Sequence, residues 1–256
     1  MSAAADDLAL ALDLADAADA IALARFGADD LIVECKPDLT PVSEADRAVE
    51  LALRELIAAR RPGDAVLGEE YGTTDSAASR RWIIDPIDGT KSYVRGIPTW
   101  ATLIALSVDD TETVGVVSMP ALGRRWWASR GGGAFADGRA VRVSAIHLLS
   151  DAHLAWSGIE DWDAVGRTDS IIELARACWR SRGVGDAWQY MLVAEGAAEI
   201  ALDPEVSVWD IAAVKVVVEE AGGRFTDLSG AATAAGGSGL ATNGLVHEAA
   251  LAIVGR

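Results

Sequence analysis

The chain has 256 residues, 51% of them hydrophobic, and a formal net charge of −17. This length can bury a sizeable core as one large domain or two closely packed lobes, whereas the negative charge disfavours sequence-independent binding of nucleic acid. No apolar stretch reaches the roughly 20 residues that a membrane-spanning helix needs, and the first 26 residues carry five aspartates instead of a basic leader. We therefore expect a cytoplasmic globular protein that binds neither a membrane nor nucleic acid.

The first part of the chain alternates helices with short strands. Apolar side chains at three- and four-residue intervals predict a helix over residues 8–26, and a strand follows at 31–35. The prolines of residues 36–42 mark a loop. Ser43 and Asp46 then resemble a capping box at the start of a second helix. Taken by itself, Asp46 fits a helix-start support and a catalytic carboxylate equally well.

Two predicted strands end in paired carboxylates. Residues 65–67 run into Gly68-Glu69-Glu70, and residues 82–84 run into Asp85, where Pro86 is expected to end the strand because proline cannot continue a sheet ladder. If these strands are neighbours, several acids lie along one edge of a sheet. That arrangement favours a cation site.

The turn after the second strand has the residue types of a site for a cation and a phosphate. Asp85 and Asp88 flank a proline of fixed φ, so both carboxylates can converge on one hard cation. Gly89 lets a ligand approach the backbone closely, and Thr90 stands where a helix N-terminus would suit a phosphate. Taken alone, Asp-x-x-Asp fits a purely structural role, in which Asp85 closes a turn and Asp88 caps a helix, as well as it fits a cation site.

The remainder predicts mixed sheets and helices. A hairpin is expected at residues 99–107 and 113–119 after a polar loop at 71–79, and residues 131–133 are interpreted as a glycine turn. Further strands are expected at 125–129, 139–143, 152–156 and 199–202, and further helices at 171–179, 187–197, 207–220 and 246–254. Such mixing without a repeat indicates layered α/β (α+β) sheets.

Three further side chains allow more than one interpretation. Asp210 follows Trp209 in the first turn of a predicted helix, where an acid favours the helix dipole whether or not it has another role. Cys35 and Cys178 lack metal or redox spacing, so we interpret them as two reduced core residues instead of a disulfide.

Four stretches together resemble the signature of the inositol monophosphatase family in order and spacing: Ser43-Glu44-Ala45-Asp46, Gly68-Glu69-Glu70, Asp85-Pro86-Ile87-Asp88-Gly89-Thr90 and Trp209-Asp210. The resemblance spans essentially the whole chain. It implies a Mg²⁺-dependent phosphatase with the layered αβαβα sandwich also found in fructose-1,6-bisphosphatase. It further implies one domain with a metal and phosphate lobe over residues 1–145, a substrate lobe over 146–256, and a homodimer.

The same resemblance implies a role for each matching residue. Glu69, Asp85 and the carbonyl of Ile87 would hold one Mg²⁺, and Asp85, Asp88 and Asp210 a second, with two or three ions in each active site. The phosphate and substrate would contact Asp88, Gly89, Thr90 and Asp210. Asp46, Thr90 and Glu69 would be catalytic, with Asp46 and Thr90 orienting a metal-activated water for in-line attack on phosphorus.

The substrate is indicated by two other stretches. Residues 91–101 and 182–186 look most like the histidinol-phosphatase branch of the family. Asp186 stands where many inositol-type members have a small hydroxyl residue, and an acid there suits an ammonium group; Asp186 and Gln189 fit a helix capping box equally well. Asp203 falls where inositol-type relatives place a substrate-binding acid.

The sequence therefore predicts a phosphomonoesterase that acts on L-histidinol phosphate in histidine biosynthesis. The first alternative is a phosphatase for inositol monophosphate or another small sugar or nucleotide phosphate. The second is a non-catalytic protein that binds protein or RNA on the same fold. Against the second stands the full set of acids, which a pure binding protein has no need to keep.

Overall fold

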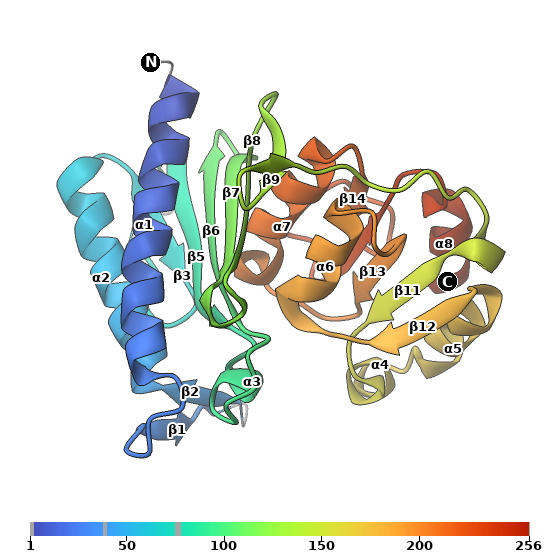
Figure 1. The fold of residues 1–256 in the computed structure, drawn as a ribbon, viewed down its shortest axis with the longest axis horizontal. Helices are drawn as coiled ribbons and strands as arrows, with labels where there is room; N and C mark the ends of the chain where they lie inside the picture. Colours follow the sequence, from blue (N-terminus) through green and yellow to red (C-terminus); the bar gives the residue numbers. More distant parts are fainter. Residues whose placement is uncertain (1–2, 38–39, 75–77, 256) are drawn as a thin grey trace.

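The computed structural model describes residues 3–37, 40–74 and 78–255, and its elements stack in five alternating layers (Figure 1). The layers are a helix pair, an eight-stranded sheet, a second helix pair, a five-stranded sheet and a group of three helices. The predicted αβαβα sandwich is confirmed. Within the described residues, no helix combines the length and the apolar character that crossing a bilayer requires.

The first layer consists of α1 (Ala3–Arg25) and α2 (Glu44–Arg60), which pack side by side on the eight-stranded sheet. The predicted capping box is present at Ser43, whose hydroxyl accepts from the Ala45 N–H at 3.2 Å. Before it, β1 (Val33–Cys35) and β2 (Pro41–Ser43) form an antiparallel ribbon, so the predicted loop already contains strand residues at its end. Residues 38–39 of that loop, and 75–77 of the predicted polar loop, lie outside the described residues.

The large sheet has the strand order β10-β9-β8-β7-β6-β5-β3-β4. All its pairs are antiparallel except β3 with β5, which run parallel and place residues 68–70 beside the end of β5. The two strands that end in carboxylates are therefore neighbours, which is the condition under which their acids lie together. The strands are β3 (Ala65–Gly68), β4 (Gly72–Thr73), β5 (Arg80–Asp88), β6 (Ala101–Val108), β7 (Thr111–Met119), β8 (Arg124–Ser129), β9 (Gly133–Ala136) and β10 (Arg139–Ala140).

Strand β5 does not end at Pro86, so that prediction is wrong. Asp85 pairs with Leu103 and Asp88 with Ala101, so three steps on β5 face two steps on β6. The extra residue makes a β-bulge, which is one of the few places where a strand accommodates proline. The Thr102 hydroxyl donates to the Pro86 carbonyl at 2.8 Å and replaces a ladder bond. Both aspartates are thereby fixed to the sheet.

The smaller sheet has the order β12-β11-β13-β15-β14 and belongs to the second half of the chain. Helices α6 (Asp186–Ala194) and α7 (Val208–Glu220) fill the layer between the two sheets, and α4 (Ile159–Ala164), α5 (Thr168–Ala177) and α8 (His247–Val254) cover the far side (Figure 1). The strands are β11 (His153–Trp156), β12 (Arg180–Gly183), β13 (Ile200–Asp203), β14 (Arg224–Thr226) and β15 (Gly239–Thr242). Short helices are α3 (Thr90–Tyr93), η1 (Pro120–Leu122) and η2 (Leu149–Asp151).

The central core joins both halves of the chain. Buried side chains of the large sheet, such as Leu103 and Val117, belong to one cluster with Met191 of α6 and Val217 of α7. The division of the chain near residue 145 stays a prediction.

The two cysteines are free, but Cys35 is exposed on the β1 ribbon, so its assignment to the core is wrong.

Candidate active site

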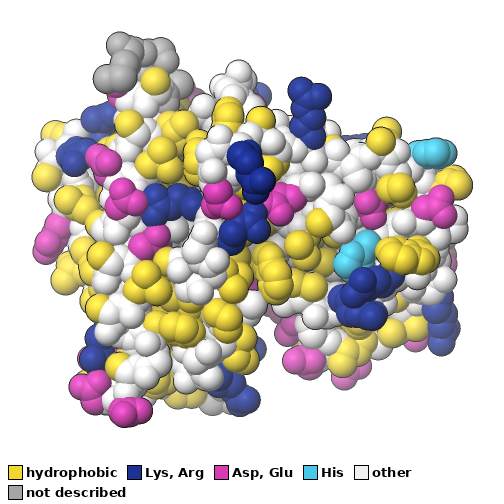
Figure 2. Space-filling model, viewed as in Figure 1, with side chains coloured by type: hydrophobic (Ala, Val, Ile, Leu, Met, Phe, Trp, Pro, Cys, Tyr) yellow, Lys and Arg dark blue, Asp and Glu magenta, His cyan; other side chains and the backbone are white. Residues whose placement is uncertain are grey.

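A cavity of about 660 Å³ lies where the ends of the two sheets face each other. In the view of Figure 2 the surface is indented between the two halves, on the side where Figure 1 shows α3 and α4. Among the described residues that line the cavity, Lys36 and Lys91 are the basic ones. Nine acidic residues of the described chain line it: Glu69, Asp85, Asp88, Glu160, Asp161, Asp186, Asp203, Glu205 and Asp210.

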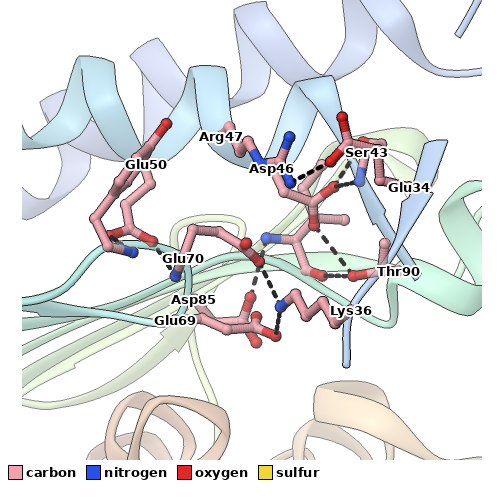
Figure 3. Close-up of polar contacts among 12 residues, drawn as sticks. Glu34, Lys36, Ser43, Asp46, Arg47, Glu50, Glu69, Glu70, Asp85 and Thr90 are labelled. Atoms are coloured by element: carbon pink, nitrogen blue, oxygen red, sulfur yellow. Dashed lines mark hydrogen bonds and ion pairs between the residues drawn. The ribbon is translucent and has the colours of Figure 1, made fainter. Parts of the chain in front are cut away.

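The sequence-predicted residues converge on this cavity. Glu69, Asp85, Ile87, Asp88, Gly89, Thr90, Asp186, Asp203 and Asp210 all line it. Asp46 is fully buried behind Thr90 and reaches the cavity through that hydroxyl (Figure 3).

Helix α2 holds Asp46 through its own N-terminus. The Asp46 Oδ2 atom accepts the Ser43 N–H at 2.8 Å and the Ser43 hydroxyl at 2.6 Å, while Oδ1 lies 3.1 Å from Thr90 Oγ1 (Figure 3). Thr90 Oγ1 is also 2.9 Å from the Ile87 carbonyl oxygen, and with one hydrogen it donates to one of the two at a time. Burial raises the pKa of Asp46, and these hydrogen bonds oppose the rise. One carboxylate therefore serves both as helix support and as the partner of Thr90.

Asp85 and Asp88 are held by backbone donors from different parts of the chain. Asp85 Oδ1 accepts the Ile87 N–H at 3.0 Å, and Asp88 Oδ2 accepts the Ala187 N–H at 2.7 Å. Asp88 therefore caps α6 from the other half of the molecule, whereas α3 begins at Gly89 without a side-chain cap. Burial and repulsion from neighbouring carboxylates raise the pKa of both aspartates well above the usual range.

Asp210 forms a capping box with Ser207 at the start of α7. Its Oδ2 atom accepts the Ser207 N–H at 2.7 Å, and the residue also lines the cavity. Burial raises the pKa of Asp210 to about 7, and the Glu69 carboxylate adds to the rise. The helix-start role and the site role coexist here as they do at Asp46.

These carboxylates fit a divalent cation. In the described part of the chain, Asp85, Asp88 and Asp210 have no ion pair with Lys or Arg, so their charges face one another without compensation. Oxygen donors of this kind are the ligands that hard cations take. No three such side chains among the described residues already close around one point, and Lys36 Nζ lies 2.7 Å from Glu69 Oε1. Full coordination therefore requires a shift of side chains, including Glu69.

Gly89 lines the cavity directly after Asp88 and lies beside the Asp186 side chain. Its φ is +77°, which favours glycine. A Cβ there would lie 2.8 Å from Asp186 Oδ2 and 3.2 Å from the Thr99 carbonyl oxygen. The absence of a side chain at this position therefore lets the Asp186 carboxylate and the Thr99 carbonyl lie close to the Gly89 backbone.

The predicted capping box of Asp186 and Gln189 is wrong. The helix N-cap is Gly185, and the Gln189 amide donates instead to Asp203 Oδ2 at 2.5 Å and to the Leu202 carbonyl. Asp186 adopts a φ of +52°, and the N–H that follows it is capped by Asp88. The Asp186 side chain is consequently available to the cavity.

Asp186 and Asp203 form an acidic wall with Asp161 of α4. Burial raises the pKa of Asp186 to about 6, which Lys91 opposes and Asp161 reinforces. Burial raises the pKa of Asp203 to about 7, although the Tyr190 hydroxyl donates to it at 2.6 Å. Asp161 adds to that rise as well. A cationic group in this part of the cavity would relieve the repulsion.

Sequence reasoning missed several lining residues. Asp161 lies on a helix of six residues, too short to give a periodic pattern, and Ser157 and Glu205 lie in connecting segments. Lys36 lies in the predicted loop, and Tyr190 is on the buried face of α6. The local signal that could have indicated the helix of Asp161 is Gly158 followed by two acids, a pattern typical of a helix start.

The full chain matches proteins of known activity and structure. A histidinol-phosphatase from Mycobacterium tuberculosis is 54% identical over 251 residues, with 96% of both chains covered. One from Streptomyces coelicolor is 51% identical over 254 residues, covering 95% of this chain and 94% of the relative. The structure of an inositol monophosphatase from Zymomonas mobilis has a TM-score of 0.89 at 29% identity, with 100% of both chains covered. The model of the inositol monophosphatase family matches residues 5–255, and the chain belongs to this family of metal-dependent enzymes.

Proposed function

We propose that the protein is a Mg²⁺-dependent phosphomonoesterase that hydrolyses L-histidinol phosphate to L-histidinol and phosphate in histidine biosynthesis. The observation that carries the proposal is that one cavity has two acidic walls, one at the end of β5 and one around Asp186 and Asp203. The names of the relatives at 54% and 51% identity support the substrate. The proposal includes a cytoplasmic location and a homodimer, as the sequence predicts.

The first wall would hold the metal. Glu69, Asp85 and the Ile87 carbonyl would bind one Mg²⁺, and Asp85, Asp88 and Asp210 another, with two or three ions in the complete site. When bound, Mg²⁺ offsets negative charge on the reacting phosphoryl group and makes water more acidic. The uncompensated charges of the three aspartates support this assignment.

Thr90 and Asp46 would orient the attacking water. When the Thr90 hydroxyl donates to Asp46 Oδ1, its lone pairs are free to accept a hydrogen bond from a water molecule in the cavity. A water held there would keep a lone pair free for attack on phosphorus, and its proton could pass through the Thr90 hydroxyl to Asp46, whose pKa burial raises. Gly89 and Thr90 would bind the phosphate through backbone N–H groups, and Glu69 completes the catalytic set.

The second wall would recognise the amine of the substrate. Asp186, Asp203 and Asp161 repel one another across a cavity in which Lys91 is the neighbouring cation. An ammonium group placed there gains charge-assisted hydrogen bonds, whereas a neutral polyol gains only ordinary ones. The wall therefore favours an amino-alcohol phosphate over an inositol phosphate.

Steady-state kinetics on the purified protein test the proposal. With Mg²⁺ present, we expect kcat/KM for histidinol phosphate to exceed the values for inositol 1-phosphate and glycerol 2-phosphate, and chelation of the metal with EDTA to abolish all three activities. A much higher kcat/KM for inositol 1-phosphate would instead support the first alternative. Absence of Mg²⁺-dependent phosphate release from any of these esters would support a non-catalytic binding role.

A further inference from the structure

Helix α2 carries a second buried carboxylate that the proposed chemistry does not use. Glu50 follows Asp46 by one helical turn, and both have a fractional exposure of 0%. Residues four apart share one face of a helix, so α2 presents both carboxylates to the same edge of the large sheet (Figure 3).

The Glu50 carboxylate binds the turn that carries Glu69. Its Oε2 atom accepts the Glu70 N–H at 2.7 Å, and its Oε1 atom accepts the Tyr71 N–H at 3.1 Å. Glycine is needed at position 68, because a Cβ there would lie 2.1 Å from Glu50 Oε1. The carboxylate thus lies against Gly68 and satisfies the backbone donors of Glu70 and Tyr71.

Arg54 completes this support. Its guanidinium pairs with Glu50 Oε1 at 2.7 Å, donates to the Gly72 carbonyl, and lies 5.9 Å from the centre of the Tyr71 ring. Buried charges are tolerated when they are paired and fully hydrogen-bonded. The pair therefore fixes the turn from Glu70 to Gly72.

We propose that Glu50 is a positioning residue that directs Glu69 into the cavity. The inference rests on the proposed role of Glu69 as a metal ligand. Glu69 also donates its N–H to the Ile84 carbonyl at 3.3 Å, so the turn is fastened to β5 as well as to α2. Helix α2 then fixes the position of Asp46 relative to Thr90 and, through Glu50, the position of Glu69 relative to Asp85.

Metal binding to the folded, metal-free protein tests this role. Titration calorimetry with Mg²⁺ should show affinity at least about 10-fold weaker in Glu50→Ala, the range typical of residues that orient metal ligands. Glu50→Gln keeps one acceptor oxygen but directs an amide toward donors, so we expect an intermediate loss. Two controls on α2 should keep the wild-type affinity: Glu55→Ala at an exposed position, and Ile57→Val, which removes one core methylene and lowers stability without touching the turn.

A double-mutant cycle examines the contact itself. Gly68→Ala places a methyl group against the Glu50 carboxylate and should also weaken Mg²⁺ binding. In the Glu50→Ala background the same substitution has room, so it should add little further loss. Additive losses would show that the two positions act separately and would contradict the inference.

The outcomes separate the two proposals. Wild-type Mg²⁺ affinity in folded Glu50→Gln and Glu50→Ala would overturn the positioning role and leave the proposed function intact. An equal loss in Ile57→Val would reduce the role of Glu50 to general stability and would overturn it too. A wild-type protein that takes up no Mg²⁺ would overturn the proposed function, and the positioning role with it.

Discussion

The two walls of the cavity are built in different ways. The wall at the end of β5 takes most of its carboxylates from regular elements, with Asp46 on α2 and Asp85 and Asp88 on β5, each held by a hydrogen bond, and takes Glu69 from the turn after β3. The opposite wall takes Asp161 from a short helix, Asp186 from a backbone of positive φ and Asp203 from the end of β13. The groups proposed for chemistry are thus fixed by the sheet, and those proposed for recognition come from separate segments.

The walls touch at two points. Asp88 accepts the Ala187 N–H at the start of α6, and Asp186 Oδ2 lies over the Cα of Gly89. Substitutions on either side of this junction should therefore separate effects on catalysis from effects on substrate choice.

The largest effect is expected for the first wall. Asp88→Asn and Asp210→Asn each remove a charged oxygen from a hard cation, so we expect about 10²-fold lower activity and weaker Mg²⁺ binding. The fold should survive because the asparagine oxygen can still accept the Ala187 or Ser207 N–H. Asp109→Asn, at an exposed turn, serves as the control. Kinetics at limiting Mg²⁺ make the measurement, and near-normal activity would remove the residue from the proposed ligands.

A smaller effect, common to all substrates, is expected for Gly89→Ala. The new Cβ would meet the Thr99 carbonyl and Asp186, and the backbone would keep a φ that costs about 1–2 kcal/mol for other residues. We expect kcat/KM to fall about 10-fold or more for histidinol phosphate and glycerol 2-phosphate alike, a loss of about 1.4 kcal/mol in transition-state stabilisation. Gly96→Ala is the matched control, with a φ of +71° and open space around it. Equal losses in both variants would attribute the effect to backbone strain alone.

The contrast between the walls also explains what the sequence could predict. Asp85, Asp88 and Glu69 follow apolar strands, so their place at a sheet edge is predictable from local pattern. Asp161 has no such context, because its helix is too short for periodicity and the aspartates with which it interacts, Asp186 and Asp203, are distant in sequence. Tertiary contacts decide such positions.

Two incorrect predictions have the same cause. Pro86 continues a strand because the pairing with β6 contains a bulge, where the Thr102 hydroxyl donates to the Pro86 carbonyl. Gln189 leaves the cap of its own helix because Asp203, on a different strand, accepts its amide. In both cases a local rule is overridden by a partner that lies elsewhere in the chain.

Substrate choice should respond to the second wall alone. Asp186→Asn removes a charge that the proposed ammonium would contact, so the ratio of kcat/KM for histidinol phosphate over glycerol 2-phosphate should fall about 10-fold. Stability should not fall, because asparagine also tolerates positive φ, Asp186 is not the helix cap, and burial raises the pKa of the carboxyl that the substitution removes. Asp110→Asn, at another residue of positive φ, is the control. An unchanged ratio would remove Asp186 from substrate recognition.

The smallest effect concerns stability without metal. Burial raises the pKa of Asp203 to about 7, so between about pH 4 and 7 the native state holds a proton that the unfolded chain releases. The stability from this protonated group is complete below about pH 4 and is lost as the pH rises through 7. Asp203→Asn has no charge to bury and can still accept from Tyr190, so with EDTA at pH 8 its melting temperature should exceed that of the wild type by about 2–6 °C.

The pH dependence of this difference is the sharper observation, because it should disappear below about pH 3, where Asp203 is neutral in both the folded and the unfolded chain. Asp227→Asn should behave in the opposite way. Burial acts to raise the pKa of Asp227, but hydrogen bonds from Ser229, Ala231 and Gly230 lower it overall, so its charge stabilises the native state above about pH 4. A wild-type protein more stable than Asp203→Asn at pH 8 would mean that Asp203 is charged and well solvated in the native state. The second wall would then already accommodate its negative charges, and its need for a cationic substrate group would lose its physical basis.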